Sequence, residues 1–301
     1  MARPNKKQHK IPRTYLQAFS NQDGLVWVGD ERLKIFQQKP SNILTENDYY
    51  TIRFPTGGGT LEIETKLLNG IEGSYSDIYR QKIRNIRVLN LEEKAKMAIF
   101  VASMMERQSM LRDALTDFIN RLEKRIKHMQ NLPNSVKKQM ANFTIPSKEK
   151  GVPAKDLLKL GKDVGSLHSS LIPKLLPDLA TIIFNMKWGF VLRNKQSYPF
   201  ITSDNPCVMM NPATEIRYGK GTIGSAPGLI QKDVEITLPL SSDIALICGW
   251  LLETDCLYTP IDKKLVDNIN FRTRRHARTI IGSDQKMLFE IAKRILKIKR
   301  I

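Results

Sequence analysis

The spacing of apolar residues changes twice along this chain, and no other feature constrains the fold as strongly. Before about residue 59 they alternate in short runs such as "GLVWVGD" and "LKIFQQ", which predicts two strands joined as a hairpin. From Thr60 to about residue 187 they recur every three or four residues, which predicts helices. Short runs such as "EITLPLS" then return before a helical end. We therefore predict an α+β fold: a helical block (roughly 60–187), short antiparallel strands near the N-terminus and in 188–250, and a helical C-terminus.

Local signals divide the helical block. Thr60 is a suitable N-cap for a first helix that extends to about Ile83. A second helix begins near Leu91 and is long enough that we expect a break around Ser109. Two prolines in "SSLIPKLLPDLA" are expected to kink or restart a later helix. The polar, basic segment around 131–153 is predicted to be a mobile loop within a single domain spanning 1–301.

The net charge of +18 favours an anionic partner, because charge of this size affects association rather than fold. Lysines and arginines concentrate in residues 3–13, 121–138 and 271–300, where contacts with phosphates would be independent of base sequence. An ordinary basic surface is the alternative. No P-loop or zinc-finger pattern is present, so we predict neither a nucleotide cofactor nor zinc.

The cysteines and the apolar runs bear on the compartment. Three cysteines without a CxxC pair indicate a reducing cytoplasm rather than a disulfide framework. The longest apolar runs are too short for a membrane span, and no signal peptide is evident at the N-terminus. We therefore predict a cytoplasmic protein.

Four segments contain candidate functional residues. His9 precedes a short predicted helix and is the side chain best suited to transfer protons near neutral pH. Glu64 and Glu72 lie about 80° apart on the first long helix, where a core-facing carboxylate needs a partner. That partner is either a metal ion or an arginine in a buried salt bridge. Asp204 opens the "TSDNP" turn, where it either binds nearby backbone or faces a site. Asn270 precedes a cluster of arginines that either contacts phosphates or is only solvated.

A different interpretation treats "LEIETK" as a strand. It would then end in the Glu-x-Lys pattern of metal-dependent nucleases of the restriction type, with Asp48 as the upstream acid. The helical interpretation accounts for more positions, because it also explains the spacing of Leu67, Leu68, Ile71 and Tyr75.

These segments together resemble the bacterial family catalogued as domain of unknown function 4238. The resemblance rests on "QHKIPRTYLQAF", "IETKLLNGIEGSY", "PFITSDNPCV" and "NINFRTRRHARTIIGS", and it spans nearly the whole chain. The matching positions are His9, Pro12, Tyr15, Leu16, Phe19, Glu64, Glu72, Thr202 to Pro206 and Asn270. Lys10 departs from the family pattern, which often has an aromatic or apolar residue there. The resemblance implies a shared fold and implies that these residues meet in space, but it supplies no activity.

From these features we hypothesise a nucleic-acid-processing protein, a metal-dependent nuclease that acts as a bacterial defence or toxin-type effector on RNA or DNA. His9 would transfer protons, and Glu64, Glu72 and Asp204 would be catalytic and hold Mg²⁺ or Mn²⁺, since oxygen ligands suit hard cations. The predicted substrate-binding residues are Lys7, Lys10, Arg13, Tyr15, Asn205, Asn270, Arg274 and Arg275. The alternatives are a non-enzymatic module that binds nucleic acid or protein, and a regulatory subunit of a multi-gene defence system. We expect Tyr15, Leu16 and Phe19 to anchor the N-terminal segment.

Overall fold

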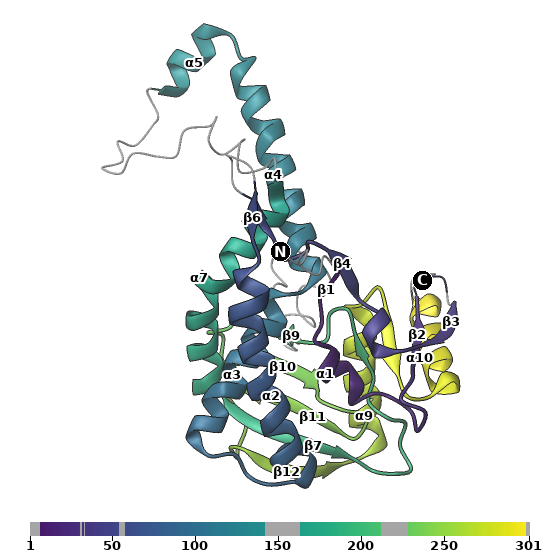
Figure 1. Cartoon of the computed structure of the whole chain (residues 1–301). Helices are drawn as coiled ribbons and strands as arrows, with labels where there is room; N and C mark the ends of the chain where they lie inside the picture. The colour runs from purple at the N-terminus through teal and green to yellow at the C-terminus, as the bar shows by residue number, and fades with distance from the viewer. Residues whose placement is uncertain are drawn as a thin grey trace.

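A five-stranded sheet of order β12-β7-β11-β10-β9 forms the centre of the computed structural model (Figure 1). The model describes residues 7–30, 32, 34–53, 58–141, 163–211 and 228–298. The strand bounds are β7 Lys187–Arg193, β9 Val208–Met210, β10 Glu235–Pro239, β11 Ile244–Gly249 and β12 Leu257–Ile261. Neighbouring strands are antiparallel except at one edge, where β12 runs parallel to β7 and Tyr258 aligns with Phe190.

Both faces of this sheet are apolar because the alternating side chains of the central strands are buried on each side. Trp188, Phe190 and Leu246 belong to the main core. Val191 and Ala245, which alternate with them, pack in a separate cluster on the other face. The sheet therefore needs a helical layer on both sides.

Three helices cover the main-core face: α2 (Asn69–Gln81), α3 (Leu91–Glu106) and α7 (Val164–Asn185). The Asn90 side chain accepts from the Glu93 amide and the Glu93 carboxylate accepts from the Asn90 amide, so a capping box begins α3. The rings of Tyr75 and Phe100 stack 3.8 Å apart between α2 and α3. Helix α9 (Lys263–Arg275) packs on the opposite face.

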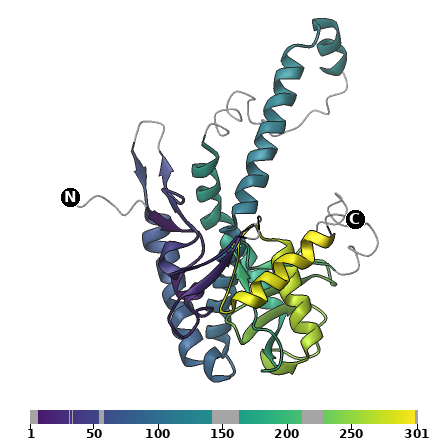
Figure 2. The same cartoon turned by 90° about the vertical axis from the view of Figure 1, so that its right-hand side faces the viewer.

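A second sheet of order β3-β2-β13-β8 joins the two ends of the chain, and helix α10 (Gln285–Ile298) packs on it (Figure 2). Its strands are β2 Val26–Gly29, β3 Ile35–Gln38, β8 Thr202–Ser203 and β13 Ile280–Gly282. Two further pairs are β1 (Lys7–His9) with β4 (Thr45–Asn47), and β5 (Ile52–Arg53) with β6 (Gly59–Thr60). The short helices α1 (Arg13–Gln17), η1 (Pro40–Asn42) and η3 (Ile83–Asn85) lie between these elements.

Helix α4 (Ser109–Gln130) projects away from the sheet layers and leads to α5 (Asn134–Ala141) at its far end (Figures 1 and 2). The break between α3 and α4 falls at Arg107 and Gln108, which confirms the break predicted near Ser109. Within the described residues, no helix is both long and apolar enough to cross a membrane.

The predicted α+β class is confirmed, as are the β2–β3 hairpin and strands β7 to β11. Several details were wrong. The central sheet continues past residue 250 into β12, and its pairing there is parallel rather than antiparallel. Strand β13 interrupts the predicted helical C-terminus. Part of the predicted mobile loop is helix α5, and residues 142–153 of it lie outside the described residues.

The start of the first long helix also differs from the prediction. Thr60 ends β6 instead of capping the helix, although its hydroxyl accepts from the Glu62 amide. A π-helical segment, η2 (Ile63–Leu68), precedes α2. The strand interpretation of "LEIETK" is therefore wrong. Helix α7 runs through both Pro173 and Pro177, so they do not restart it.

Candidate functional site

The short helix α1 holds the N-terminal segment against the core. Tyr15, Leu16 and Phe19 are fully buried, which confirms them as the predicted anchor. The Tyr15 hydroxyl donates to the carbonyl oxygen of Pro239 (2.6 Å) and lies 2.7 Å from the Thr202 hydroxyl. The Tyr15 side chain has no access to solvent, and substrate binding by Tyr15 stays a prediction.

Arg107 organises a buried cluster next to His9. Its side chain is 1% exposed, and its Nη1 donates to Glu72 Oε1 at 2.8 Å. Its Nη2 donates to the His9 carbonyl oxygen (3.1 Å), and its Nε donates to the Tyr50 hydroxyl (2.8 Å). That hydroxyl donates in turn to the carbonyl oxygen of Lys10. We call His9, Tyr50, Glu72 and Arg107 the Arg107 cluster. It links α2, α3 and the N-terminal strand.

Gln8 connects this cluster to Glu64. The Gln8 side chain is fully buried, its Nε2 donates to Glu64 Oε2 (2.7 Å), and its Oε1 accepts from the Tyr50 amide (2.6 Å). Burial raises the pKa of Glu64, and the negative charge of Glu72 adds to the effect, while the Gln8 hydrogen bond opposes it. The structure thus brings His9, Glu64 and Glu72 into one region.

His9 is half-buried, and its tautomer follows from its hydrogen bond. Its Nε2 lies 3.2 Å from the Ser41 carbonyl oxygen, which can only accept, so Nε2 carries a proton. Burial lowers the pKa of His9, against the opposing effects of the Ser41 hydrogen bond and Glu72. The lowered pKa favours the neutral imidazole. Its Nδ1 carries the lone pair and has no hydrogen-bond partner within the described part of the chain.

The "TSDNP" turn binds the end of α9 and the residues that follow it. Asp204 Oδ1 accepts from the amides of Arg278 (3.0 Å) and Thr279 (3.1 Å), and burial raises its pKa against these bonds. Asn205 Nδ2 donates to the carbonyl oxygen of His276 (3.0 Å). Both side chains therefore bind backbone, but of a distant segment rather than of their own turn as the sequence predicted.

Asp204 faces a cavity of about 320 Å³ at the base of α4. Lys10 and Arg112 both bind Glu46 there, at 3.5 and 3.0 Å. Arg278 binds Asp113 at 2.8 Å. The cations of this cavity are thus matched by carboxylates.

The remaining predicted substrate-binding residues have mixed outcomes. Asn270 is 1% exposed, and it accepts from the Ile201 amide and donates to the Pro199 carbonyl oxygen, both at 2.9 Å. Arg274 is 6% exposed and donates to the carbonyl oxygen of Ala277. Asn205, Asn270 and Arg274 are thus buried and bound to protein groups, and substrate contact by them stays a prediction. The side chains that keep access to solvent are those of Lys7, Lys10, Arg13 and Arg275.

The three carboxylates predicted to hold a metal are bound to different protein groups: Gln8 for Glu64, Arg107 for Glu72, and two backbone amides for Asp204. Among the described residues, no group of three or more His, Cys, Asp or Glu side chains is arranged to hold a metal ion. Glu72 would have to leave Arg107 to become a ligand. These donors do not fit a shared site, and Mg²⁺ or Mn²⁺ binding stays a prediction.

Sequence reasoning did not identify Gln8, Tyr50 or Arg107. A buried salt bridge to an arginine was one of the two interpretations of the glutamate pair, and Glu72 has one. The signal for Arg107 was its place at the end of an otherwise apolar stretch, "AIFVASMMER", where a charged side chain is buried only with partners.

Comparison with known proteins gives one match. No curated protein and no solved structure matches the chain. One family model, described as "Protein of unknown function (DUF4238)", matches residues 7–286. The match includes the N-terminal segment, the π-helical turn, the "TSDNP" turn and β13, which are the segments that the contacts above hold together. The chain therefore belongs to the DUF4238 family.

Proposed function

We propose that this protein is a nucleic-acid-processing enzyme that hydrolyses phosphodiester bonds with His9 as the general base. The observation that carries the proposal is the geometry of His9: its Nε2 is committed to the Ser41 carbonyl oxygen, which leaves Nδ1 as the nitrogen that can accept a proton. A general base works best when its pKa lies near the working pH and it is positioned to reach the proton that it removes. A role in bacterial defence or as a toxin-type effector stays a prediction.

The surroundings of His9 suit this chemistry. His9 Nδ1 would take a proton from the attacking water or hydroxyl, and the negative charge of Glu72 would stabilise the resulting imidazolium. The positive charges of Arg13 and Lys7 act on the same ring, and both side chains are exposed. They are suited to hold the phosphate, whose charge grows in the transition state.

The π-helical turn supports a functional role for this region. Extended π hydrogen bonding is rare and is often found at functional sites. Here it places Glu64, on η2, against Gln8 of the N-terminal strand while Glu72, on α2, reaches Arg107. A regular helix would set a different angle between these two carboxylates.

The test is a cleavage assay with labelled RNA, single-stranded DNA and duplex DNA, each with Mg²⁺, with Mn²⁺ and with a chelator. We expect the wild type to cleave at least one substrate and H9A to lose about 100-fold or more of the rate. H128A is the matched control, because His128 is an exposed histidine on α4. Absence of cleavage by the wild type in every arm contradicts the proposal, as does full activity of H9A.

A second candidate function is non-enzymatic binding of nucleic acid. It is favoured by one observation: each of the predicted catalytic carboxylates already binds a group of the protein, as structural residues do. Binding of labelled RNA and DNA that weakens steeply with salt, together with no cleavage in any arm, would support this function. In that case H9A and E64A would lower the melting temperature.

A further inference from the structure

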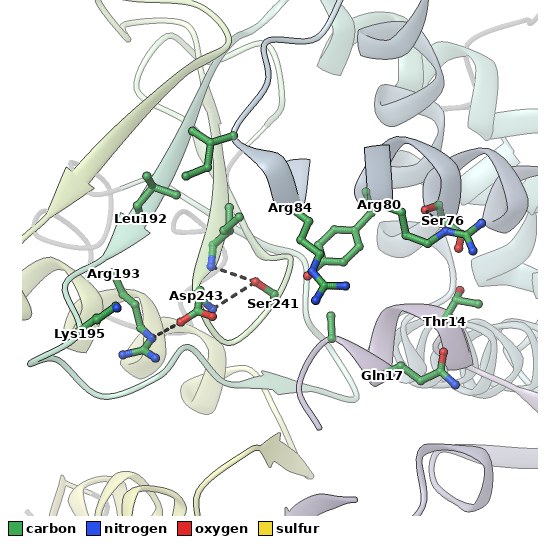
Figure 3. A pocket seen from close by; sticks show the side chains of 14 residues that line it. Thr14, Gln17, Ser76, Arg80, Arg84, Leu192, Arg193, Lys195, Ser241 and Asp243 are labelled. Carbon is green, nitrogen blue, oxygen red and sulfur yellow. Dashed lines mark hydrogen bonds and ion pairs between the residues drawn. The ribbon is translucent and has the colours of Figure 1, made fainter. Parts of the chain in front are cut away.

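A cavity of about 980 Å³ lies between α2 and β7, apart from the Arg107 cluster (Figure 3). Arg80 and Arg84 stand on one side of it, contributed by α2 and η3. Arg193 and Lys195 stand on the other side, at the end of β7 and in the turn that follows. None of these four cations was among the residues predicted from the sequence as functional.

The cavity has an excess of positive charge. Asp243 is the only carboxylate that lines it among the described residues, and it is bound to Arg193 at 2.6 Å. Arg80 pairs with Asp77 at 2.7 Å, but both side chains are more than 60% exposed, so the interaction within this ion pair is weak. Arg84 and Lys195 have no ion-pair or hydrogen-bond partner within the described part of the chain. Cations that face one cavity without matching carboxylates attract an anion to it.

The other lining groups suit a ligand with both polar and ring-shaped parts. Ser76 and Thr14 supply hydroxyls, and the Thr14 oxygen is buried without a hydrogen-bond partner in the described residues. Tyr79, Leu192 and Ile86 supply aromatic and apolar surface. The volume is at the upper end of the range for small-molecule sites, which is about 300–1,000 Å³.

Ile86 has an unusual backbone conformation for its residue type. Its φ is 55°, in the left-handed region, and its side chain is 53% exposed. This conformation is uncommon for a β-branched residue, and such strained residues concentrate at ligand sites. The strain holds an apolar side chain at the cavity where solvent reaches it.

We propose that this cavity binds a nucleotide, with its phosphates between the two pairs of cations and its base against Tyr79, Leu192 and Ile86. Cations on two sides of one cavity can reach several phosphates of one small ligand, whereas a nucleic-acid strand is usually held by cations that continue along a surface. The proposal does not rest on hydrolysis at His9, because none of its residues belongs to the Arg107 cluster.

The experiment is calorimetric titration of the full chain with ATP, with inorganic triphosphate, with adenosine and with a ten-residue oligothymidylate. We expect ATP to bind more tightly than adenosine or triphosphate, because both halves of the cavity contribute. The variant R84E/K195E should weaken ATP binding by roughly 100-fold, since it removes two charge-assisted contacts and adds repulsion. The milder R84Q/K195Q should weaken it by roughly 10-fold.

The control is K34E/K264E, which makes the same change of net charge at exposed lysines away from the cavity. Unchanged urea midpoints would show that all variants remain folded, as expected for exposed residues. The proposal is overturned if the wild type does not bind ATP, or if the control pair weakens ATP binding as much as R84E/K195E does. It is also overturned if the oligothymidylate binds more tightly than ATP, which would assign the cavity to a nucleic-acid strand.

Discussion

Arg107→Met should destabilise the protein by about 3 kcal/mol. The side chain is 1% exposed and donates to three groups: Glu72, the Tyr50 hydroxyl and the carbonyl oxygen of His9. Removing one partner of a buried ion pair costs about 3–5 kcal/mol, because the other charge stays buried without compensation. The Glu72 side chain is 21% exposed, so water can partly replace Arg107, and the lower end of that range applies. Methionine has a similar length, so it should leave no large cavity.

The measurement is urea unfolding followed by circular dichroism. A loss of about 3 kcal/mol would lower the midpoint by roughly 1 M or more at the usual slopes. The double variant R107M/E72Q should recover about 1–2 kcal/mol, because replacing both partners removes the unpaired charge. Arg80→Met is the matched control at an exposed ion pair, and it should change stability by less than about 0.5 kcal/mol. If R107M is no less stable than R80M, or if the double variant recovers nothing, the Arg107 cluster does not stabilise the fold as argued.

Three further outcomes are expected. Tyr15→Phe should lower the free energy of unfolding by about 1–2 kcal/mol in urea titrations, because the buried Thr202 hydroxyl and Pro239 carbonyl oxygen lose a partner; an unchanged midpoint would contradict that role. Burial raises the pKa of Glu106 from 4.5 to about 7. Between these two pH values the folded state keeps a proton that the unfolded state has released, so the free energy of unfolding falls as the pH rises from 4.5 to about 7. Glu106→Gln should therefore gain stability relative to the wild type as pH rises from 5 to about 7.5, and a difference that does not change with pH would refute this. The imidazole signals of His9 should titrate with a midpoint below 6.5 in an NMR pH series, since burial lowers its pKa. A midpoint above 7 would contradict the role of His9 as a general base, because the imidazole would then be mostly protonated at neutral pH.

The sequence predicted the helices and strands that are specified by the spacing of their own apolar residues. The spacing of apolar residues located α2, α3 and α7, and alternation located β2, β3, β7 and β11. Strand β12 was missed because it lies at a sheet edge, where proline is tolerated and Pro260 hides the strand pattern. Its parallel pairing with β7 is a property of the three-dimensional arrangement and has no signature in a single strand. Strand β13 is three residues long and follows a basic helix, so its pattern was too short to interrupt the predicted helix.

The sequence indicated which residues belong to the candidate site, but not which groups they bind. His9, Glu64, Glu72 and Asp204 were expected to meet. The structure places the first three around Gln8 and Arg107, whereas Asp204 binds backbone amides of another segment. The sequence could not show that Arg107 is the arginine that pairs with Glu72. The chain has many arginines, and the pairing depends on where α3 ends. Asp204 was recognised as a turn residue, but its partners are amides of a segment about 75 residues away, which no local pattern reveals.

The position of β13 also determines when the chain can complete its fold during synthesis. Ile280 pairs with Gly29 near one end of the chain and with Ser203 in its middle, so β13 lies between two strands that have no other link in that sheet. A nascent chain on the ribosome can form the β2–β3 hairpin early, but the hydrogen-bonding edge of β2 stays unpaired until residues 280–282 emerge. Pairing over such sequence separation is slow, and an unpaired edge can associate with other chains. We therefore expect the emergence of residues 280–282 from the ribosome, rather than formation of the helical block, to limit the rate at which this part of the chain reaches its native state.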